Sequence, residues 1–211
     1  MPQLHYYPSN ASFLPHVMLR EIGAPFELVL VDRTRNAQKS ADYLRLNPNG
    51  LIPTLVDGDL VIFETAAIAL YLADKHPDAG LAPPFGSALR GAYYKWMVHL
   101  SNTVQAGFRA WFYPHEFVAD PSASDTAKEA AGLKMMAAFD RIADQLGDGP
   151  WLLGETFSAA DLYLMMLTRW GRSLPRPARD IPEIEAHSAR VLARPAVQAA
   201  IAAEREAAPS A

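Results

Sequence analysis

A short Pro- and Gly-rich stretch, DAGLAPPFGS at residues 78–87, divides the sequence into two parts with different hydrophobic periodicity. Before this stretch, apolar residues follow the pattern of short strands and helices in alternation. After it, the chain is rich in Ala and follows the 3.6-residue helical period with no strand pattern. We therefore expect an α/β domain over residues 1–77, a linker over 78–87 and an all-helical domain over 88–211.

The first part contains the elements of a compact α/β domain. The segments QLHYY and FELVLVD predict two strands, separated by a helix, SFLPHVMLREIG, that Gly23 ends. In IPTLVDGDLVIF, the pair Asp57-Gly58 is a strong signal for a tight turn between two strands. A last helix, TAAIALYLADKH, ends at Pro77. The order β-α-β, linker, β-β-α predicts an α/β fold with one antiparallel hairpin.

The second part predicts long helices only. We expect them over residues 88–112, 126–146, 160–170 and 181–203, and the final AAEREAAPSA is typical of a fraying helix end followed by a tail. The segment FSAADLYL predicts a capping box, in which Ser158 and Asp161 each accept a hydrogen bond from the other's backbone N–H. We interpret this box as a folding device rather than a functional site.

Charge and cysteine content exclude several classes of function. The chain has 19 Lys and Arg residues against 23 Asp and Glu residues, and this net charge of -4 argues against nucleic-acid binding and against a basic membrane patch. It has no cysteine, so any thiol chemistry must use the thiol of another molecule. No apolar run is long enough to indicate a membrane span, and we expect a cytoplasmic protein. None of the six histidines follows a metal-ligand spacing, and we expect no metal.

Three small polar side chains, Ser9, Asn10 and Ser12, lie where the first strand passes into the first helix. Lowering the pKa of a thiol from near 8.5 by two units requires about 2.7 kcal/mol of selective thiolate stabilisation. One hydrogen bond to a charged group contributes roughly 1.5–3 kcal/mol, and a helix N-terminus adds about 0.3–1 kcal/mol. Any of the three side chains could therefore stabilise a bound thiolate. The alternative is that Asn10 or Ser12 only caps the helix.

Two further motifs each allow a structural and a ligand-binding interpretation. In NPNGLIPTL, Pro53 either marks the start of an edge strand or forms a cis bond with Ile52 that turns the Ile52 backbone toward an extended ligand. In FETAAIALYLAD, Thr65 is either a plain helix N-cap or part of a site for a ligand anion at the helix N-terminus. Glu64 could bind a ligand ammonium group, so the pair could hold an α-amino acid.

These motifs together resemble the glutathione transferase superfamily over nearly the whole chain. NPNGLIPTL, FETAAIALYLAD, the Pro-rich link and GPWLLGETFSAADLYL stand in the order that is usual in that family. The resemblance implies a thioredoxin-like domain that binds glutathione as co-substrate, followed by a helical domain, in a homodimer. The implied activity is that of a glutathione transferase in detoxification, in which the glutathione thiolate attacks small hydrophobic electrophiles.

The resemblance also implies roles for particular residues. The Ile52 backbone would pair with the cysteinyl part of glutathione beside a cis Pro53, and Glu64 and Thr65 would hold the γ-glutamyl group. Lys39 would face the glycyl carboxylate, although a solvated surface lysine is the alternative. Gln38 lies beside it, and the candidates for the electrophile pocket are Tyr6, Gln105, Trp111, Phe112 and His115. The Tyr6 hydroxyl and the aromatic cluster at 107–117 could equally be structural.

The turn after the first strand departs from the family pattern. The cysteine of the beta class falls on Ala11, and the serine of theta- and delta-like members falls on Asn10. Because asparagine occurs at this turn in some bacterial and fungal relatives, Asn10 is a candidate thiolate donor, with Ser12 and Ser9 close behind. The sequence does not rank the three. Val98 takes the place of an asparagine of the beta class, so the chain resembles beta-, theta- and nu-like members without a clean class match. A glutathione-dependent disulfide reductase or peroxidase, and a non-catalytic glutathione-binding protein, remain alternative functions.

Overall fold

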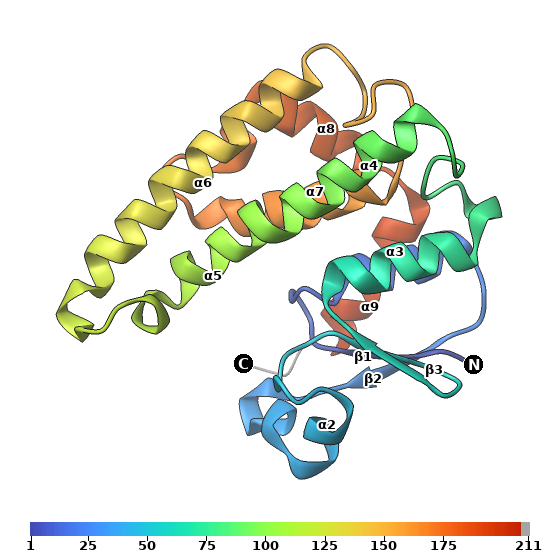
Figure 1. Cartoon of the computed structure of the whole chain (residues 1–211), viewed down its shortest axis with the longest axis horizontal. Helices are drawn as coiled ribbons and strands as arrows, with labels where there is room; N and C mark the ends of the chain where they lie inside the picture. Colours follow the sequence, from blue (N-terminus) through green and yellow to red (C-terminus); the bar gives the residue numbers. More distant parts are fainter. Residues whose placement is uncertain (208–211) are drawn as a thin grey trace. The chain divides into compact units, whose positions relative to one another are not determined.

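The computed structural model describes residues 1–207 and divides into two compact units (Figure 1). The first unit combines Met1–Leu81 with the C-terminal segment that begins at Ala193, and the second spans Ala82–Leu192. The boundary in sequence therefore falls inside the Pro- and Gly-rich stretch. The C-terminal segment, which the sequence patterns assigned to the helical domain, packs with the first unit instead. Residues 208–211 of the predicted tail lie outside the described part of the chain.

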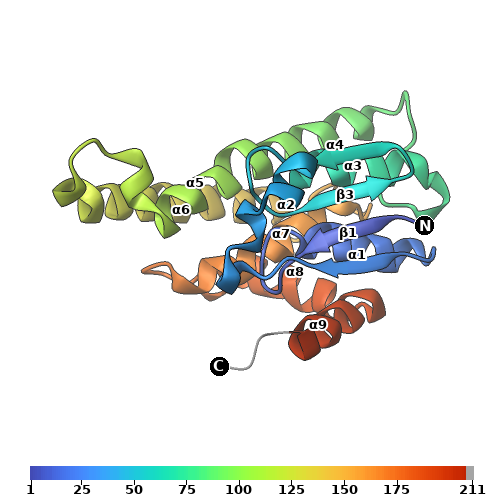
Figure 2. The same cartoon turned by 90° about the horizontal axis from the view of Figure 1, so that it is seen from below.

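Four short strands form a mixed sheet in the order β2-β1-β3-β4. Strand β1 (Gln3–Tyr6) pairs in parallel with β2 (Glu27–Leu30) and antiparallel with β3 (Thr54–Asp57), as Figure 2 shows from below. Strands β3 and β4 (Leu60–Phe63) form the expected hairpin, whose turn contains Gly58 with a φ of 63°. The parallel pair requires a crossover, and α1 (Phe13–Ile22) supplies it. The predicted α/β fold class is confirmed.

Helices cover both faces of this sheet. Helices α1 and α3 (Thr65–Lys75) pack together on one face, and the short α2 (Ala41–Leu46) lies on the other (Figure 1). Helix α9 (Pro195–Ala207) packs against α1. The core of the unit consists of fully buried apolar side chains that include Leu4, Leu14, Leu55, Ile68 and Leu72.

The second unit is all-helical, as predicted. Its α-helices are α4 (Ala88–His99), α5 (Ala106–Phe112), α6 (Ser124–Leu146), α7 (Ala159–Trp170) and α8 (Pro182–Leu192). Helix α7 is buried over Ala159–Thr168 and forms the centre of the unit (Figure 1). A π-helix, Leu100–Gln105, joins α4 to α5 within the segment predicted as one helix. None of the helices in residues 1–207 is long and apolar enough to cross a membrane.

One predicted helix is wrong in its length. The segment 181–203 was expected to form a single helix, but α8 ends at Leu192 and α9 begins at Pro195. A proline has no backbone N–H, and it disfavours the helical conformation at the residue before it. Pro195 can therefore begin a helix but cannot continue one, and the break at Ala193 and Arg194 separates α8 from α9.

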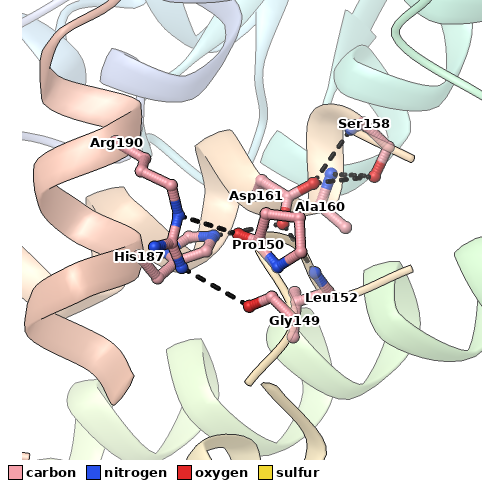
Figure 3. A network of polar contacts seen from close by, with 8 residues as sticks. All are labelled: Gly149, Pro150, Leu152, Ser158, Ala160, Asp161, His187 and Arg190. Carbon is pink, nitrogen blue, oxygen red and sulfur yellow. Dashed lines mark hydrogen bonds and ion pairs between the residues drawn. The ribbon is translucent and has the colours of Figure 1, made fainter. Parts of the chain in front are cut away.

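The capping box predicted at the start of α7 is present (Figure 3). The Ser158 hydroxyl accepts from the N–H of Ala160 at 3.3 Å, and Oδ2 of Asp161 accepts from the N–H of Ser158 at 2.9 Å. Oδ1 of the fully buried Asp161 also accepts from the N–H of Leu152 at 2.9 Å and lies 3.1 Å from Nε2 of His187. The box is therefore part of a larger buried network. It joins the start of α7 to α8 through His187 and to the loop before α7 through Leu152.

Candidate active site

Strand pairing brings the predicted ligand-binding segments to one end of the sheet. His5 of β1 and Phe63 of β4 both lie opposite Thr54 of β3. Because β3 runs antiparallel to both neighbours, the end of β1, the start of β3 and the end of β4 lie at the same end of the sheet. The turn at residues 7–12, the segment entering β3 at Pro53 and the start of α3 therefore meet there.

Ser12 closes the turn that follows β1. Its side chain is fully buried, and its hydroxyl donates to the carbonyl of Tyr7 at 3.0 Å and accepts from the N–H of Tyr7 at 3.2 Å. The hydroxyl proton is therefore used within the turn. Ser12 precedes α1 but makes no side-chain cap hydrogen bond to it, so the capping alternative does not apply to this residue.

Asn10 is half-buried and has a defined side-chain orientation. Its Oδ1 accepts a hydrogen bond from the N–H of Ala11 at 2.7 Å. A backbone N–H can only donate, so the atom that faces it must be the amide oxygen, and the amide nitrogen Nδ2 points away with its two N–H donors. Ser9, the neighbouring residue, is exposed and has a left-handed backbone conformation with a φ of 59°.

The segment that leads into β3 is held by side chains of the preceding helix. The peptide bond between Ile52 and Pro53 is cis, which confirms that prediction, and Ile52 is buried. The hydroxyl of Tyr43 in α2 donates to the carbonyl of Leu51 at 2.7 Å, and Nδ2 of Asn47 donates to the same carbonyl at 2.8 Å. Burial raises the pKa of the Tyr43 hydroxyl above its usual value, which keeps it protonated as a donor.

The connection from β4 to α3 has an unusual backbone conformation. Glu64 is the residue before the helix and has a φ of 73°, in a backbone region that residues other than glycine seldom adopt. Thr65 is buried. Because it is the first residue of α3, the N-cap position belongs to Glu64 and not to Thr65. The exposed Glu64 makes no cap hydrogen bond with its side chain. The first amides of α3 are therefore not capped by the Glu64 side chain, and a helix N-terminus of this kind favours an anion.

Lys39 is anchored beside the segment that leads to Ile52. Its Nζ donates to the carbonyl of Asn49 at 3.1 Å, and a Cβ at Gly50 would lie only 2.7 Å from this Nζ. The exposed lysine is therefore positioned, and its ammonium keeps further N–H donors for an anion. Oε1 of Gln38 is buried and has no hydrogen-bond partner among the described residues.

Comparison with known proteins identifies the family. Residues 2–74 match the family model described as glutathione S-transferase, N-terminal domain, and residues 104–195 match the glutathione S-transferase, C-terminal domain. Glutathione S-transferase GST-4.5 of Xanthomonas campestris is 31% identical over 202 residues, which cover 96% of this chain and 98% of the relative. The chain belongs to the glutathione S-transferase family.

Two solved structures similar to this glutathione transferase contain glutathione. A glutathione transferase homologue from Sulfitobacter with bound glutathione has a TM-score of 0.87 at 28% identity, over 94% of this chain and 96% of that one. A sphingomonad glutathione S-transferase complexed with glutathione has a TM-score of 0.84 at 33% identity, over 96% of this chain and 98% of that one.

The helical unit of the transferase holds two of the predicted electrophile-pocket residues by hydrogen bonds. Gln105 lies at the end of the π-helix, and its Oε1 accepts from the hydroxyl of the buried Tyr163. The indole N–H of Trp111 donates to the hydroxyl of Ser173 at 3.0 Å. Both polar groups therefore have partners within the unit.

The other two candidates of this unit lie in more exposed positions. Phe112 is 45% exposed and stacks on the buried Phe108, with ring centroids 5.7 Å apart, and also contacts Trp170. His115 is exposed and meets the ring of Tyr113 edge-on. Phe112 therefore extends an aromatic cluster to the surface of the unit, whereas His115 stands outside that cluster.

Glu204 is a residue of the site that sequence patterns did not identify. It lies in the segment interpreted as a fraying helix end, yet its side chain is buried and its Oε2 accepts from the N–H of Ser9 at 2.9 Å. Val197, Ala200 and Glu204 are the buried residues of α9 and follow the helical spacing i, i+3, i+7. A carboxylate on the buried stripe of an amphipathic helix was the signal that could have indicated a polar partner.

Tyr6 is a further titratable group near the turn. Tyr6 is buried, and burial together with the nearby charge of Glu204 raises the pKa of its hydroxyl. In residues 1–207, no group of three or more His, Cys, Asp or Glu side chains is arranged to hold a metal ion.

Proposed function

We propose that this transferase binds glutathione at the end of the sheet and uses the Asn10 amide to stabilise the glutathione thiolate for attack on small hydrophobic electrophiles. The observation that carries the proposal is the hydrogen bond from the Ala11 N–H to Oδ1 of Asn10, which leaves Nδ2, with its two N–H donors, on the side of the amide away from Ala11. A hydrogen bond to a charged group contributes roughly 1.5–3 kcal/mol, and a shift of two pKa units requires about 2.7 kcal/mol. One well-placed amide could therefore supply most of the activation.

The remaining parts of glutathione would be bound by groups of opposite charge or complementary hydrogen bonding. The Ile52 backbone would pair with the cysteinyl residue, and Glu64 would bind the α-ammonium of the γ-glutamyl group. The α-carboxylate would lie at the N-terminus of α3 beside the Thr65 hydroxyl. Lys39, with Gln38 next to it, would bind the glycyl carboxylate as a positioned cation.

The reaction would be a nucleophilic displacement or addition at an electrophilic carbon. The sulfur lone pair forms the S–C bond, and either a leaving group departs with its electron pair or the adduct takes a proton from solvent. The candidates for contact with the electrophile are Tyr6 in the first unit and a group of residues in the helical unit. Phe112 offers an exposed aromatic surface there, and Gln105, Trp111 and His115 are the other candidates. We further propose a homodimer that acts in the cytoplasm in detoxification, on the strength of the family resemblance.

The test is the ultraviolet absorbance of the bound glutathione thiolate as a function of pH. We expect the wild type to lower the pKa of the bound thiol by one unit or more. In Asn10→Ala, the thiol pKa should return most of the way to its value in free glutathione. Asn10→Asp keeps the acceptor for the Ala11 N–H but replaces the donor by a negative charge, so it should raise the thiol pKa above that in Asn10→Ala. Ser9→Ala and Ser12→Ala are the matched controls and should leave the thiol pKa depressed.

Other outcomes would select the alternatives. Tight glutathione binding without any pKa depression in the wild type would indicate a non-catalytic glutathione-binding protein. Thiolate formation with rapid exchange against a mixed disulfide, but no conjugation to a halogenated aromatic compound, would indicate a disulfide reductase. Loss of the depression in Ser9→Ala but not in Asn10→Ala would transfer the donor role to Ser9.

A further inference from the structure

A buried carboxylate from the C-terminal helix holds the backbone of the turn that carries Asn10. Glu204 of α9 is 4% exposed, and its Oε2 accepts a hydrogen bond from the N–H of Ser9 at 2.9 Å. Ser9 directly precedes Asn10, and its φ of 59° lies in a region that non-glycine residues enter only when the surrounding structure holds them. The hydrogen bond to Glu204 is a contact able to hold this conformation.

The other carboxylate oxygen of Glu204, Oε1, lies near His16, and the contacts of His16 show which of its ring nitrogens carries the proton. Nε of Arg20 donates to Nε2 of His16 at 2.9 Å, so Nε2 carries the lone pair and the ring proton is on Nδ1. Nδ1 of His16 lies 3.8 Å from Oε1 of Glu204, and neither atom has a hydrogen-bond partner among the described residues. The fully buried His16 therefore carries its N–H on the nitrogen that lies 3.8 Å from the Glu204 carboxylate.

Only one of the two Glu204 oxygens makes a hydrogen bond to the turn. Oε2 accepts from the N–H of Ser9, whereas Oε1 lies 3.8 Å from Nδ1 of His16, beyond hydrogen-bond distance, so a glutamine can keep the contact to Ser9. A polar chain thus runs from Arg20 through His16 and Glu204 to the backbone of Ser9.

The C-terminal helix is also fixed to α1 at its other end. Arg194, just before α9, donates from Nε and from a terminal guanidinium nitrogen to the two carboxylate oxygens of Glu21 in α1, at 2.6 and 2.8 Å. Two-point pairing of this kind restricts the orientation of both side chains. Helix α9 therefore approaches the turn from a defined position.

We propose that Glu204 is a positioning residue for glutathione activation, which sets the backbone of Ser9 and thereby the place where the Asn10 amide meets the sulfur. The proposal rests on the function proposed above. It makes the C-terminal helix part of the active-site machinery, acting through the backbone of Ser9. Small displacements of a catalytic donor are expected to lower activity strongly, because a hydrogen bond weakens steeply with distance and angle.

The experiment compares Glu204→Ala, Glu204→Gln and a control, Glu206→Ala, which removes an exposed carboxylate from the same helix. The readouts are the pKa of the bound glutathione thiol, kcat and KM for glutathione, the melting temperature, and hydrogen exchange of the Ser9 amide. In Glu204→Ala we expect the bound thiol pKa to rise by about 0.5–1 unit and kcat to fall about three- to tenfold. Glutamine keeps an acceptor for the Ser9 N–H, so Glu204→Gln should retain kcat within about threefold.

A purely structural role would give a different pattern. Both Glu204 variants would then melt at lower temperature while the bound thiol pKa stayed at the wild-type value, and the proposal would be overturned. If Glu204→Ala fails to fold, hydrogen exchange of the Ser9 amide in the wild type tests the proposal. The proposal requires this amide to exchange at least about tenfold more slowly than in an unstructured chain. Rapid exchange of that amide would overturn the proposal. Absence of thiolate in the wild type would instead refute the proposed function, so the two failures are distinguishable.

Discussion

The Ser12 hydroxyl and the Tyr7 backbone exchange two hydrogen bonds, one in each direction, at 3.0 and 3.2 Å. This pair joins the start of the turn after β1 to the start of α1. A hydroxyl whose proton and lone pair are both used in this way is a structural group. It leaves Asn10 and Ser9 as the side chains of the turn that can face a ligand.

Ser12→Ala should therefore lower stability more than it changes thiol activation. The substitution removes the Ser12 partner of the Tyr7 N–H and carbonyl, while the carbonyl keeps the hydrogen bond from the N–H of Asn10 at 3.3 Å. We expect a loss of about 1–3 kcal/mol in the free energy of unfolding. Urea denaturation followed by circular dichroism measures this loss. Ser9→Ala, at an exposed position three residues earlier, is the control and should change stability by less than about 0.5 kcal/mol. Equal stabilities of the two variants would contradict the assignment.

Asp57 should make stability depend on pH in the acidic range. Lys75 donates to its carboxylate, with a further hydrogen bond from the Tyr71 hydroxyl at 2.8 Å, and these contacts hold the pKa of Asp57 below its usual 3.8. The unfolded chain then binds the proton more readily, so the stabilisation is present above about pH 5 and is lost as the pH falls through the folded-state pKa.

Asp57→Asn should accordingly lower the free energy of unfolding by about 1 kcal/mol at pH 7, a value reduced by the partial exposure of Lys75. The difference from wild type should shrink as the pH falls below about 5 toward the lowered pKa of Asp57, as measured by urea denaturation over a pH series. Asp59→Asn, at an exposed position of the same hairpin turn, is the control. A difference that stayed constant from pH 7 to pH 3 would show that the ion pair is not its source.

The buried Asp161 should be one of the most sensitive positions of the helical unit. Its two oxygens accept from the N–H groups of Leu152 and Ser158, and one of them lies beside His187 (Figure 3). Asp161→Asn replaces one acceptor by a donor that faces other donors, and we expect a loss of about 2–4 kcal/mol in unfolding free energy. Asp125→Asn, in the exposed first turn of α6, should lose less than about 1 kcal/mol. A similar loss in both variants would contradict the role of the network.

Tyr43→Phe should weaken glutathione binding indirectly, through the backbone that Tyr43 holds. The hydroxyl holds the Leu51 carbonyl, next to the Ile52 backbone that is proposed to pair with glutathione. We expect the Kd for glutathione, measured by calorimetry, to rise about two- to fivefold, the equivalent of about 0.5–1 kcal/mol. The control is Tyr94→Phe, which removes an exposed hydroxyl from the other unit. An unchanged Kd would mean that Asn47 alone positions Leu51.

The elements that local patterns specify were predicted correctly. The strand, helix, strand unit, the hairpin at Gly58 and the capping box at Ser158 all have signals within a few residues of each other. The break between α8 and α9 was missed although Pro195 marks it, because both segments are helical and only residues 193 and 194 separate them. Local sequence thus determines which segments form helices and strands, and it leaves some boundaries open.

The candidate site shows the same division. The segments 7–12, 52–53 and 64–65 are recognisable as motifs, but three polar residues of the first turn remained equivalent until the structure placed the Ser12 hydroxyl on Tyr7. The partner of Ser9 is still further from any local signal, because Glu204 follows it by 195 residues. A contact over that separation exists only because α9 packs on α1, and no periodicity or propensity within either segment encodes the distance between them. The amino-acid sequence therefore specifies the motifs and the family, whereas packing alone selects which of their polar groups face a ligand and which hold the turn in place.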